Sequence, residues 1–147
     1  HLHVNSVSAF CFGITKLGPD ERILGVVGES GILALQRDHQ SCTFDLGLGD
    51  AVTDLRWSDD GRHLLLPSAD SHAYIYDLSR LECPLTCFEC GDAVKTARYQ
   101  PSNQAVLATG SRDGNIRLWD TRLSSSNSRL NKEVMLIANT HSTSFSS

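Results

Sequence analysis

The clearest alternation of hydrophobic and polar residues lies in the stretch Leu107–Arg122. A short apolar run is followed by the polar sequence Ser-Arg-Asp-Gly, and its Asp-Gly pair at 113–114 is typical of a tight turn between strands. Polar and apolar residues then alternate from Asn115 to Leu118, which is the period-two pattern of a strand with one buried face. The stretch therefore predicts a β-hairpin whose second strand ends in Trp119 and Asp120.

The same pattern recurs along the chain. Ala51–Trp57 aligns with Ala93–Tyr99 at an offset of 42 residues. Asp70 aligns with Asp113 at an offset of 43, so we expect a one-residue insertion near 101–104. Repeats of about 40 to 45 residues that each contain several short strands are typical of the blades of a β-propeller, whereas helical repeats are shorter. The periodicity therefore predicts an all-β fold.

An earlier and more degenerate copy precedes these two, with its first strand at Val7–Phe12 and its hairpin at Gly28–Leu35. We therefore expect three consecutive blades of a larger ring, because a propeller closes with about four to eight blades. The expected boundaries are a degenerate blade at 1–49, blades at 50–91 and 92–138, and a loop or disordered segment at 139–147.

Each copy is expected to contain four strands. The apolar run Leu64-Leu65-Leu66 predicts a strand that neighbouring blades cover on both sides. The expected strands of the second and third copies are Ala51–Trp57, His63–Pro67, Ala73–Asp77, Leu85–Phe88, Ala105–Gly110, Asn115–Asp120 and Glu133–Ala138.

The hairpin resembles the core of a WD repeat. Thr109, Asp113 and Trp119 match three members of the hydrogen-bonding tetrad that is typical of such repeats. Where these repeats usually carry Gly-His before the inner strand, the chain has Gly49-Asp50 and Gly91-Asp92. The resemblance implies a WD-repeat β-propeller, whose ring usually has seven blades, and in this chain an incomplete tetrad.

Composition and charge exclude some classes of protein. The chain has 147 residues, 40% of them hydrophobic, which is ordinary for a globular domain, and its formal net charge of −4 gives no overall reason to bind nucleic acid. No apolar run approaches the roughly 20 residues of a membrane-spanning helix. The chain starts with His1 rather than Met, so we expect it to be part of a longer protein without a signal peptide here.

Three cysteines have a spacing that deserves comparison with an enzyme family. Cys83, Cys87 and Cys90 form a C-x3-C-x2-C pattern that resembles the cluster-binding signature of radical S-adenosylmethionine enzymes. Such an enzyme needs alternating strands and helices, and the chain has almost no helical periodicity. We therefore expect no metal and no cofactor here. The chain has five cysteines, an odd number without the density of a small secreted scaffold, so we expect them to be reduced intracellular thiols.

No set of side chains has the spacing of a catalytic site. The neighbouring carboxylates Asp59 and Asp60 precede a glycine and are typical of a solvated turn. The six histidines show no spacing of metal ligands, and no Gly-rich phosphate loop occurs. The sequence therefore predicts a protein-binding platform with no catalytic residues.

The end of the hairpin suggests what the platform binds. Trp119, Asp120 and Arg122 resemble the Trp-Asp-x-Arg box of receptors that dock on the adaptor of cullin-4 ubiquitin ligases. In the second copy the same box is absent, because Arg80 lies one position too late after Asp77. The alternative is that Arg122 is only a solvated cation in a loop.

A longer match extends this resemblance. Together with the box, Gly110–Ile116 is similar to an early propeller blade of denticleless proteins, which are substrate receptors of these ligases. The resemblance implies two kinds of partner, which are the ligase adaptor and degron-bearing substrates on the DNA sliding clamp. It also implies a nuclear location and a role in replication, in the response to DNA damage and in the cell cycle. Arg112 is a candidate substrate contact because it lies on the turn. The other open hypotheses are a WD-repeat scaffold in another nuclear complex and the cluster enzyme.

Overall fold

Every regular element among the described residues is a β-strand. The computed structural model describes residues 10–16, 22–28, 31–124 and 131–137. The strands are β1 (Phe10–Lys16), β2 (Arg22–Gly28), β3 (Ile32–Arg37), β4 (Gln40–Asp45), β5 (Arg56–Trp57), β6 (His63–Pro67), β7 (His72–Asp77), β8 (Thr86–Glu89), β9 (Val94–Gln100), β10 (Asn103–Ser111), β11 (Ile116–Ser124) and β12 (Asn131–Ile137).

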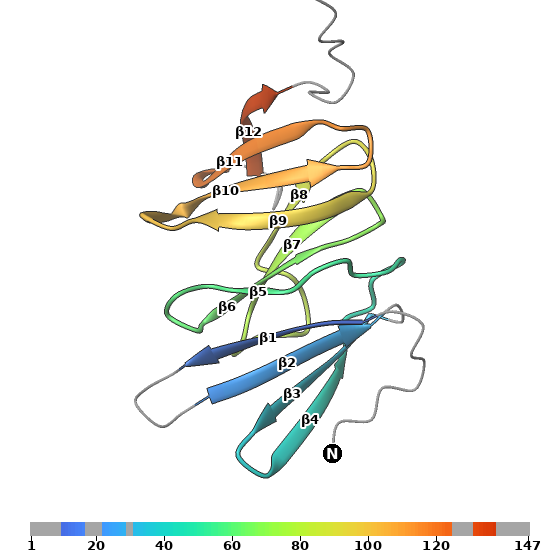
Figure 1. Cartoon of the computed structure of the whole chain (residues 1–147), viewed down its shortest axis with the longest axis vertical. Coiled ribbons are helices and arrows are strands. Elements are labelled where there is room, and N and C mark those ends of the chain that lie inside the picture. Colours follow the sequence, from blue (N-terminus) through green and yellow to red (C-terminus); the bar gives the residue numbers. More distant parts are fainter. Residues whose placement is uncertain (1–9, 17–21, 29–30, 125–130, 138–147) are drawn as a thin grey trace, which may run out of the picture.

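The strands form three antiparallel sheets of four strands each, and in every sheet consecutive strands are neighbours. The first blade contains β1 to β4, the second β5 to β8 and the third β9 to β12. Figure 1 shows the second blade between the other two along the long axis of the molecule. This arrangement confirms the predicted all-β fold with three consecutive propeller blades.

Two hydrophobic cores hold the blades together, and β6 contributes to both. Leu64 and Leu66 belong to the core between the first and second blades, whereas Leu65 belongs to the core between the second and third blades. All three side chains are fully buried, because successive side chains of a strand point to opposite faces. The structure thus confirms the reason proposed for this unbroken apolar run.

Several of the predicted strands differ in extent from those observed. The predicted inner strand Ala51–Trp57 is wrong for most of its length, because only Arg56–Trp57 forms a strand and Val52 pairs with Ser68 as an isolated bridge. The intervening backbone is satisfied in other ways: the Thr53 N–H donates to the Pro67 carbonyl at 2.9 Å, and the Leu55 N–H donates to the Asp54 carboxylate at 2.9 Å.

The inner strand of the first blade extends beyond its predicted end. It is observed as Phe10–Lys16 and so continues four residues past Phe12, while residues 7–9 of the predicted strand Val7–Phe12 lie outside the described residues. The predicted hairpin between 28 and 35 is present, since β2 ends at Gly28 and the Gly31 N–H donates to the Gly28 carbonyl at 3.2 Å. The predicted loop at 139–147 lies outside the described residues.

Candidate functional site: the two rims of the third blade

Trp119 anchors the third blade through its side-chain packing. Its side chain is 2% exposed, and its ring lies 5.2 Å from that of Phe88 in the second blade. The indole Nε1–H donates to the Thr109 hydroxyl at 3.0 Å, and the Cys90 thiol donates to the same hydroxyl at 3.5 Å. Trp119 therefore satisfies its one polar group inside the core between the second and third blades.

Asp113 makes a separate group of hydrogen bonds at the turn before β11. Its Oδ1 accepts from the Ser111 hydroxyl at 2.6 Å and from the Asn115 backbone N–H at 3.0 Å. The hydrogen bond from Ser111 is the largest cause that lowers the pKa of Asp113. The structure therefore brings Thr109 and Trp119 together directly, whereas Asp113 bonds to neither.

Gly91 and Asp92 precede the inner strand β9, where WD repeats usually carry Gly-His, and the sequence pattern did not predict the contacts that they make. Gly91 adopts a positive φ of 79°, and a Cβ there would lie 3.0 Å from Nη2 of Arg117. Asp92 accepts from Arg112 Nη2 at 3.0 Å, which holds the exposed Arg112 side chain beside the turn. Cys90, rather than a histidine, is the side chain that reaches Thr109. Spacing alone gives no signal for this role of a thiol.

At the other end of β11, Arg122 is bound to Asp120 by two side-chain hydrogen bonds. Arg122 Nε donates to Oδ1 at 2.9 Å and Nη2 donates to Oδ2 at 2.6 Å. The Arg122 backbone N–H also donates to Oδ1, at 2.9 Å. These bonds from Arg122 lower the pKa of the Asp120 carboxyl to about 2 and raise the pKa of Arg122. The Arg122 side chain stays 65% exposed, so the pair presents a permanent cation to solvent.

Arg122 lies within strand β11. One of the two interpretations of the sequence had placed it in a loop. β11 continues to Ser124, four residues beyond the predicted end at Asp120. Asp113 precedes this strand and Arg122 lies near its far end. At about 3.3 Å per residue the two side chains are more than roughly 20 Å apart along the strand. Arg112 and Arg122 thus lie on opposite rims of the third blade.

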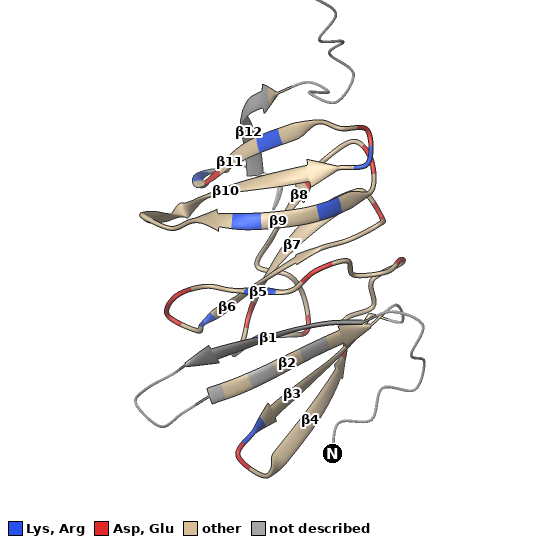
Figure 2. Cartoon of the chain, in the orientation of Figure 1, with Lys and Arg blue, Asp and Glu red and all other residues tan. Residues whose placement is uncertain are grey.

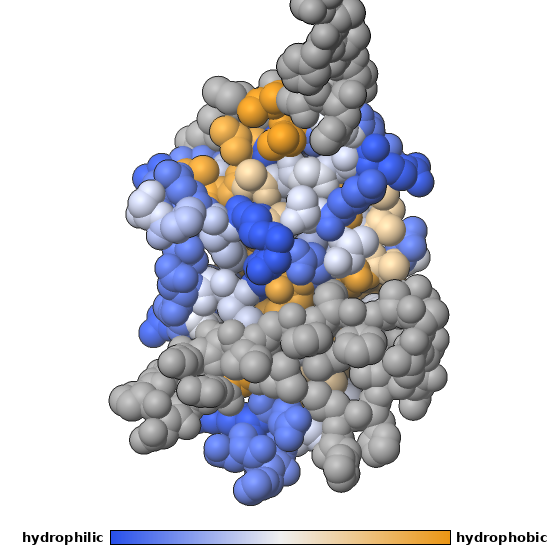
Figure 3. Space-filling model, in the orientation of Figure 1, coloured by the Kyte–Doolittle hydropathy of each residue, from blue (hydrophilic) through white to orange (hydrophobic). Residues whose placement is uncertain are grey.

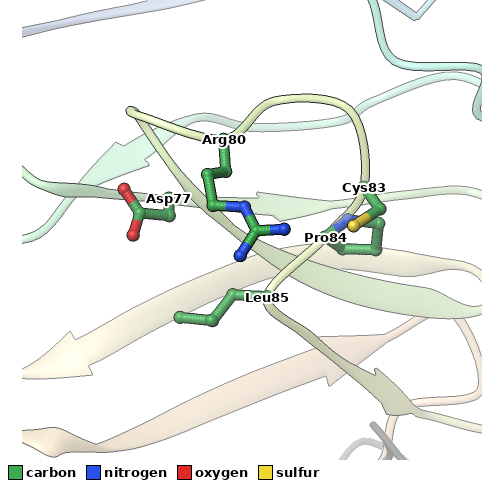
Figure 4. A pocket seen from close by; sticks show the side chains of 5 residues that line it. All are labelled: Asp77, Arg80, Cys83, Pro84 and Leu85. Carbon is green, nitrogen blue, oxygen red and sulfur yellow. The ribbon is translucent and has the colours of Figure 1, made fainter.

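The second blade forms a turn at the position where the third blade continues as a strand, and its residues there differ. Asp77 corresponds to Asp120, and its Oδ1 accepts from the Ser79 N–H at 2.9 Å and from the Ser79 hydroxyl at 2.8 Å. Ser79 therefore takes the place that Arg122 has in the third blade. Arg80 lines a pocket of about 250 Å³ with Asp77, Cys83, Pro84 and Leu85. Figure 4 shows that the Arg80 guanidinium and the Asp77 carboxylate point in different directions.

The three cysteines of the C-x3-C-x2-C pattern do not converge. Cys90 is buried against Thr109, Cys87 lies on β8, and Cys83 lies in the preceding loop. Among the residues that the structure describes, no group of three or more His, Cys, Asp or Glu side chains could hold a metal ion. The part of the chain that the structure describes contains no helix that is long and apolar enough to cross a membrane.

Comparison with known proteins agrees with this architecture. The chain is 30% identical over 129 residues to the Denticleless protein homolog of Mus musculus, a match that covers 84% of this chain and 18% of that protein. It is 33% identical over 113 residues to Denticleless protein homolog A of Xenopus laevis, covering 72% of this chain and 16% of that protein. The chain thus spans less than a fifth of the length of these relatives.

The chain is also similar to proteins other than the Denticleless homologs. The Protein LST8 homolog of Drosophila pseudoobscura pseudoobscura is 31% identical over 112 residues, covering 71% of this chain and 34% of that protein. A chain in a crystal structure of the mitotic checkpoint complex has the same fold, with a TM-score of 0.65 at 23% identity over 80% of this chain and 37% of that chain. The family model "WD domain, G-beta repeat" matches residues 40–77 and 82–120, and the chain therefore belongs to the WD-repeat family.

Proposed function

We propose that this chain is part of a non-catalytic substrate receptor of a cullin-4 ubiquitin ligase, and that it docks on the ligase adaptor through Trp119, Asp120 and Arg122. The observation that carries the proposal is the presentation of Arg122. Its side chain is 65% exposed, yet its Nε and Nη2 are both fixed on Asp120. A fixed, exposed arginine loses less side-chain entropy on binding than a free one, and arginine is a favoured residue at the centre of interfaces.

Each residue of the box has a distinct role in this proposal. Trp119 is buried and fixes β11 in the core, so its part in docking is to hold in place the rim that carries Asp120 and Arg122. Asp120 orients the guanidinium. Arg122 keeps its remaining N–H donors for acceptors on the adaptor, because a guanidinium has five of them and stays charged at all physiological pH values.

The similarity to the Denticleless homologs supports the ligase as the assembly. In this proposal the receptor acts in the nucleus during replication and after DNA damage, and its substrates carry degrons presented on the DNA sliding clamp. The opposite rim, where Arg112 is 69% exposed beside Asp92, is available to the substrate while the adaptor occupies the rim of Arg122. One blade can then contact two partners. The alternative is a WD-repeat protein-interaction scaffold in another nuclear complex, and it is supported by the WD-repeat match together with 31% identity to a relative that is not a Denticleless homolog.

The test compares two arginines on opposite rims that are similar in side-chain exposure and in having an aspartate partner. Arg122 and Arg112 are 65% and 69% exposed, and each is paired with one aspartate. In the full-length protein, Arg122→Ala is expected to weaken binding to purified cullin-4 adaptor about 30-fold, which corresponds to roughly 2 kcal/mol. Arg112→Ala is expected to leave adaptor binding unchanged, and thermal melts of both variants should match the wild type.

The outcomes separate the two candidate functions. Equal adaptor affinity of wild type and Arg122→Ala would reject the docking role and favour the scaffold. A loss of binding together with a loss of folding would mean that Arg122 is a structural residue. An equal loss in both variants would indicate a general effect of charge rather than a contact at one rim.

A further inference from the structure

Two arginines and an aspartate form a cluster at the inner edges of the second and third blades, away from the two rims that carry Arg112 and Arg122. A single carboxylate oxygen, Oδ2 of Asp54, accepts from Arg56 Nε at 3.2 Å and from Arg98 Nη1 at 2.7 Å. Arg56 lies on β5 and Arg98 on β9, so the bond from Arg98 crosses between the blades. The two guanidinium groups are therefore neighbours although they are far apart in the sequence.

Both arginines occupy the same structural position in their blades. Arg56 pairs with Leu65, which pairs with Ile75, and in the next blade Arg98 pairs with Ala108, which pairs with Leu118. The equivalent position of the first blade is Gly13, which pairs with Gly25. The innermost strands therefore place cations side by side at one level of two adjacent blades.

The cluster has more cations than anions and unused donors. Among the described residues, the only side-chain hydrogen bond of Arg56 is that to Asp54, so its two terminal nitrogens make none. Arg98 uses Nη1 for Asp54, Thr96 and the Ala97 carbonyl, which leaves Nε and Nη2 without partners. The side chains of Arg56 and Arg98 are 42% and 52% exposed. The unused nitrogens of both arginines are thus accessible to an anion.

The pictures show where the strands of the cluster lie. Figure 2 shows positive residues on β5 and on β9, and Figure 3 shows a strongly hydrophilic patch at the place of β9 in the same view. Apolar side chains flank the patch in the same view. This face combines charge for an anion with apolar surface for the residues around it.

We propose that the Arg56–Asp54–Arg98 cluster is a binding site for an acidic peptide segment of a partner protein. One carboxylate of the segment accepts two parallel hydrogen bonds from the terminal nitrogens of Arg56, the bidentate geometry that guanidinium groups favour. A second carboxylate accepts from the unused nitrogens of Arg98. Asp54 holds both groups in place and prevents them from moving apart by charge repulsion.

A peptide fits the cluster better than a nucleic acid. Nucleic-acid binding needs many neutralised phosphates, whereas this chain carries a formal charge of −4 and the cluster itself contains Asp54. Two carboxylates on one short segment need only two guanidinium groups. The proposal goes beyond the adaptor and substrate rims, and it holds whether or not Arg122 binds an adaptor.

Fluorescence anisotropy with full-length protein tests the site. The probe is a fluorescein-labelled peptide of alternating Asp and Glu, and its control carries Asn and Gln in their places. We expect the acidic probe alone to bind, and Arg56→Gln with Arg98→Gln to weaken it at least about tenfold, which corresponds to roughly 1.4 kcal/mol. Arg62→Gln removes the same charge from an exposed turn, so it should change the affinity less than about twofold.

Arg56→Gln alone keeps the proposal testable if Arg98→Gln disturbs the contact between blades. Arg56 bonds only within its own blade, so its variant should lose affinity with an unchanged melting temperature. Equal binding by wild type and Arg56→Gln overturns the proposal. Tighter binding of a labelled single-stranded oligonucleotide than of the acidic peptide, with the same dependence on Arg56 and Arg98, also overturns it in favour of a nucleic-acid site.

Discussion

Arg122 and Asp120 lie two residues apart on β11, and their side chains form a bidentate pair in which Nε meets Oδ1 at 2.9 Å and Nη2 meets Oδ2 at 2.6 Å. Residues at positions i and i+2 of a strand point to the same face, so the strand itself brings the two groups together. The corresponding positions of the second blade hold Asp77 and Ser79, which bond to each other without a cation. The charged pair is therefore a property of the third blade among the described blades.

The pair should be visible as a shifted titration of Asp120. The hydrogen bonds from Arg122 hold the pKa of this carboxyl at about 2, below the ordinary value of 3.8. Arg122→Ala should return the pKa most of the way toward its ordinary value, and Arg122→Lys should leave it between the two. Nuclear magnetic resonance of the side-chain carboxyl carbons as a function of pH measures all three values.

The sign of the accompanying stability change follows from linkage. A carboxyl whose pKa is lower in the folded state stabilises the fold above its unfolded pKa, and this contribution is lost as the pH falls toward the folded pKa. For Asp120 the window lies between pH 3.8 and about 2. A wild-type pKa near the ordinary value would contradict the bidentate pair.

Truncation of Trp119 should strongly destabilise the domain. Its ring fills the core between the second and third blades against Phe88, and its N–H donates to Thr109. Trp119→Ala in the full-length protein is expected to lower the free energy of unfolding by about 3–5 kcal/mol, the range for large buried aromatic residues. Denaturant unfolding gives the value. An unchanged midpoint would contradict the buried position of the ring.

Removal of the Tyr76 hydroxyl should stabilise the domain, in contrast to truncation of Trp119. Tyr76 takes the place of Trp119 in the second blade, and its hydroxyl is buried without a hydrogen-bond partner among the described residues. An unpaired buried polar group costs about 1–3 kcal/mol, so Tyr76→Phe should raise the free energy of unfolding by about 1 kcal/mol. Tyr74→Phe is the control, because it removes a hydroxyl that donates to Asp70 at 2.5 Å and should therefore destabilise.

The same substitution should also change the response to alkali. Burial raises the pKa of Tyr76 to about 12 from 10.0, so the unfolded state loses its proton first as the pH rises. The wild type therefore loses stability between pH 10 and about 12, and Tyr76→Phe should lose less. Melting temperatures of the two proteins across this range check the effect. Parallel curves would indicate that the Tyr76 hydroxyl is solvated.

The sequence determined the local pattern of the blades. The alternation around Asp113 and the offset of the repeats predicted the hairpin of β10 and β11, and the run Leu64-Leu65-Leu66 predicted a strand covered on both faces. These features follow from backbone geometry, since strand residues alternate between faces and turns need particular residue types. The docking role of Arg122 and the substrate role of Arg112 stay predictions.

Which side chains meet depends on how the strands and sheets pack in three dimensions. Thr109 accepts hydrogen bonds from Trp119 and Cys90, whereas Asp113 accepts from Ser111 within its own turn, and neither set of partners follows from the spacing of the residues. The irregular path of residues 53–55 likewise depends on contacts with the neighbouring blade, where the Thr53 hydroxyl donates to the Val94 carbonyl at 2.7 Å.

The inner arginine cluster shows the same division. The sequence alignment places Arg56 and Arg98 at equivalent positions of two repeats, and by itself it gives no reason for them to touch. Their meeting on one oxygen of Asp54 depends on how closely two twisted sheets pack at their inner edges. Periodicity along a chain fixes the face on which a side chain lies, but the packing of one sheet against the next fixes its partner.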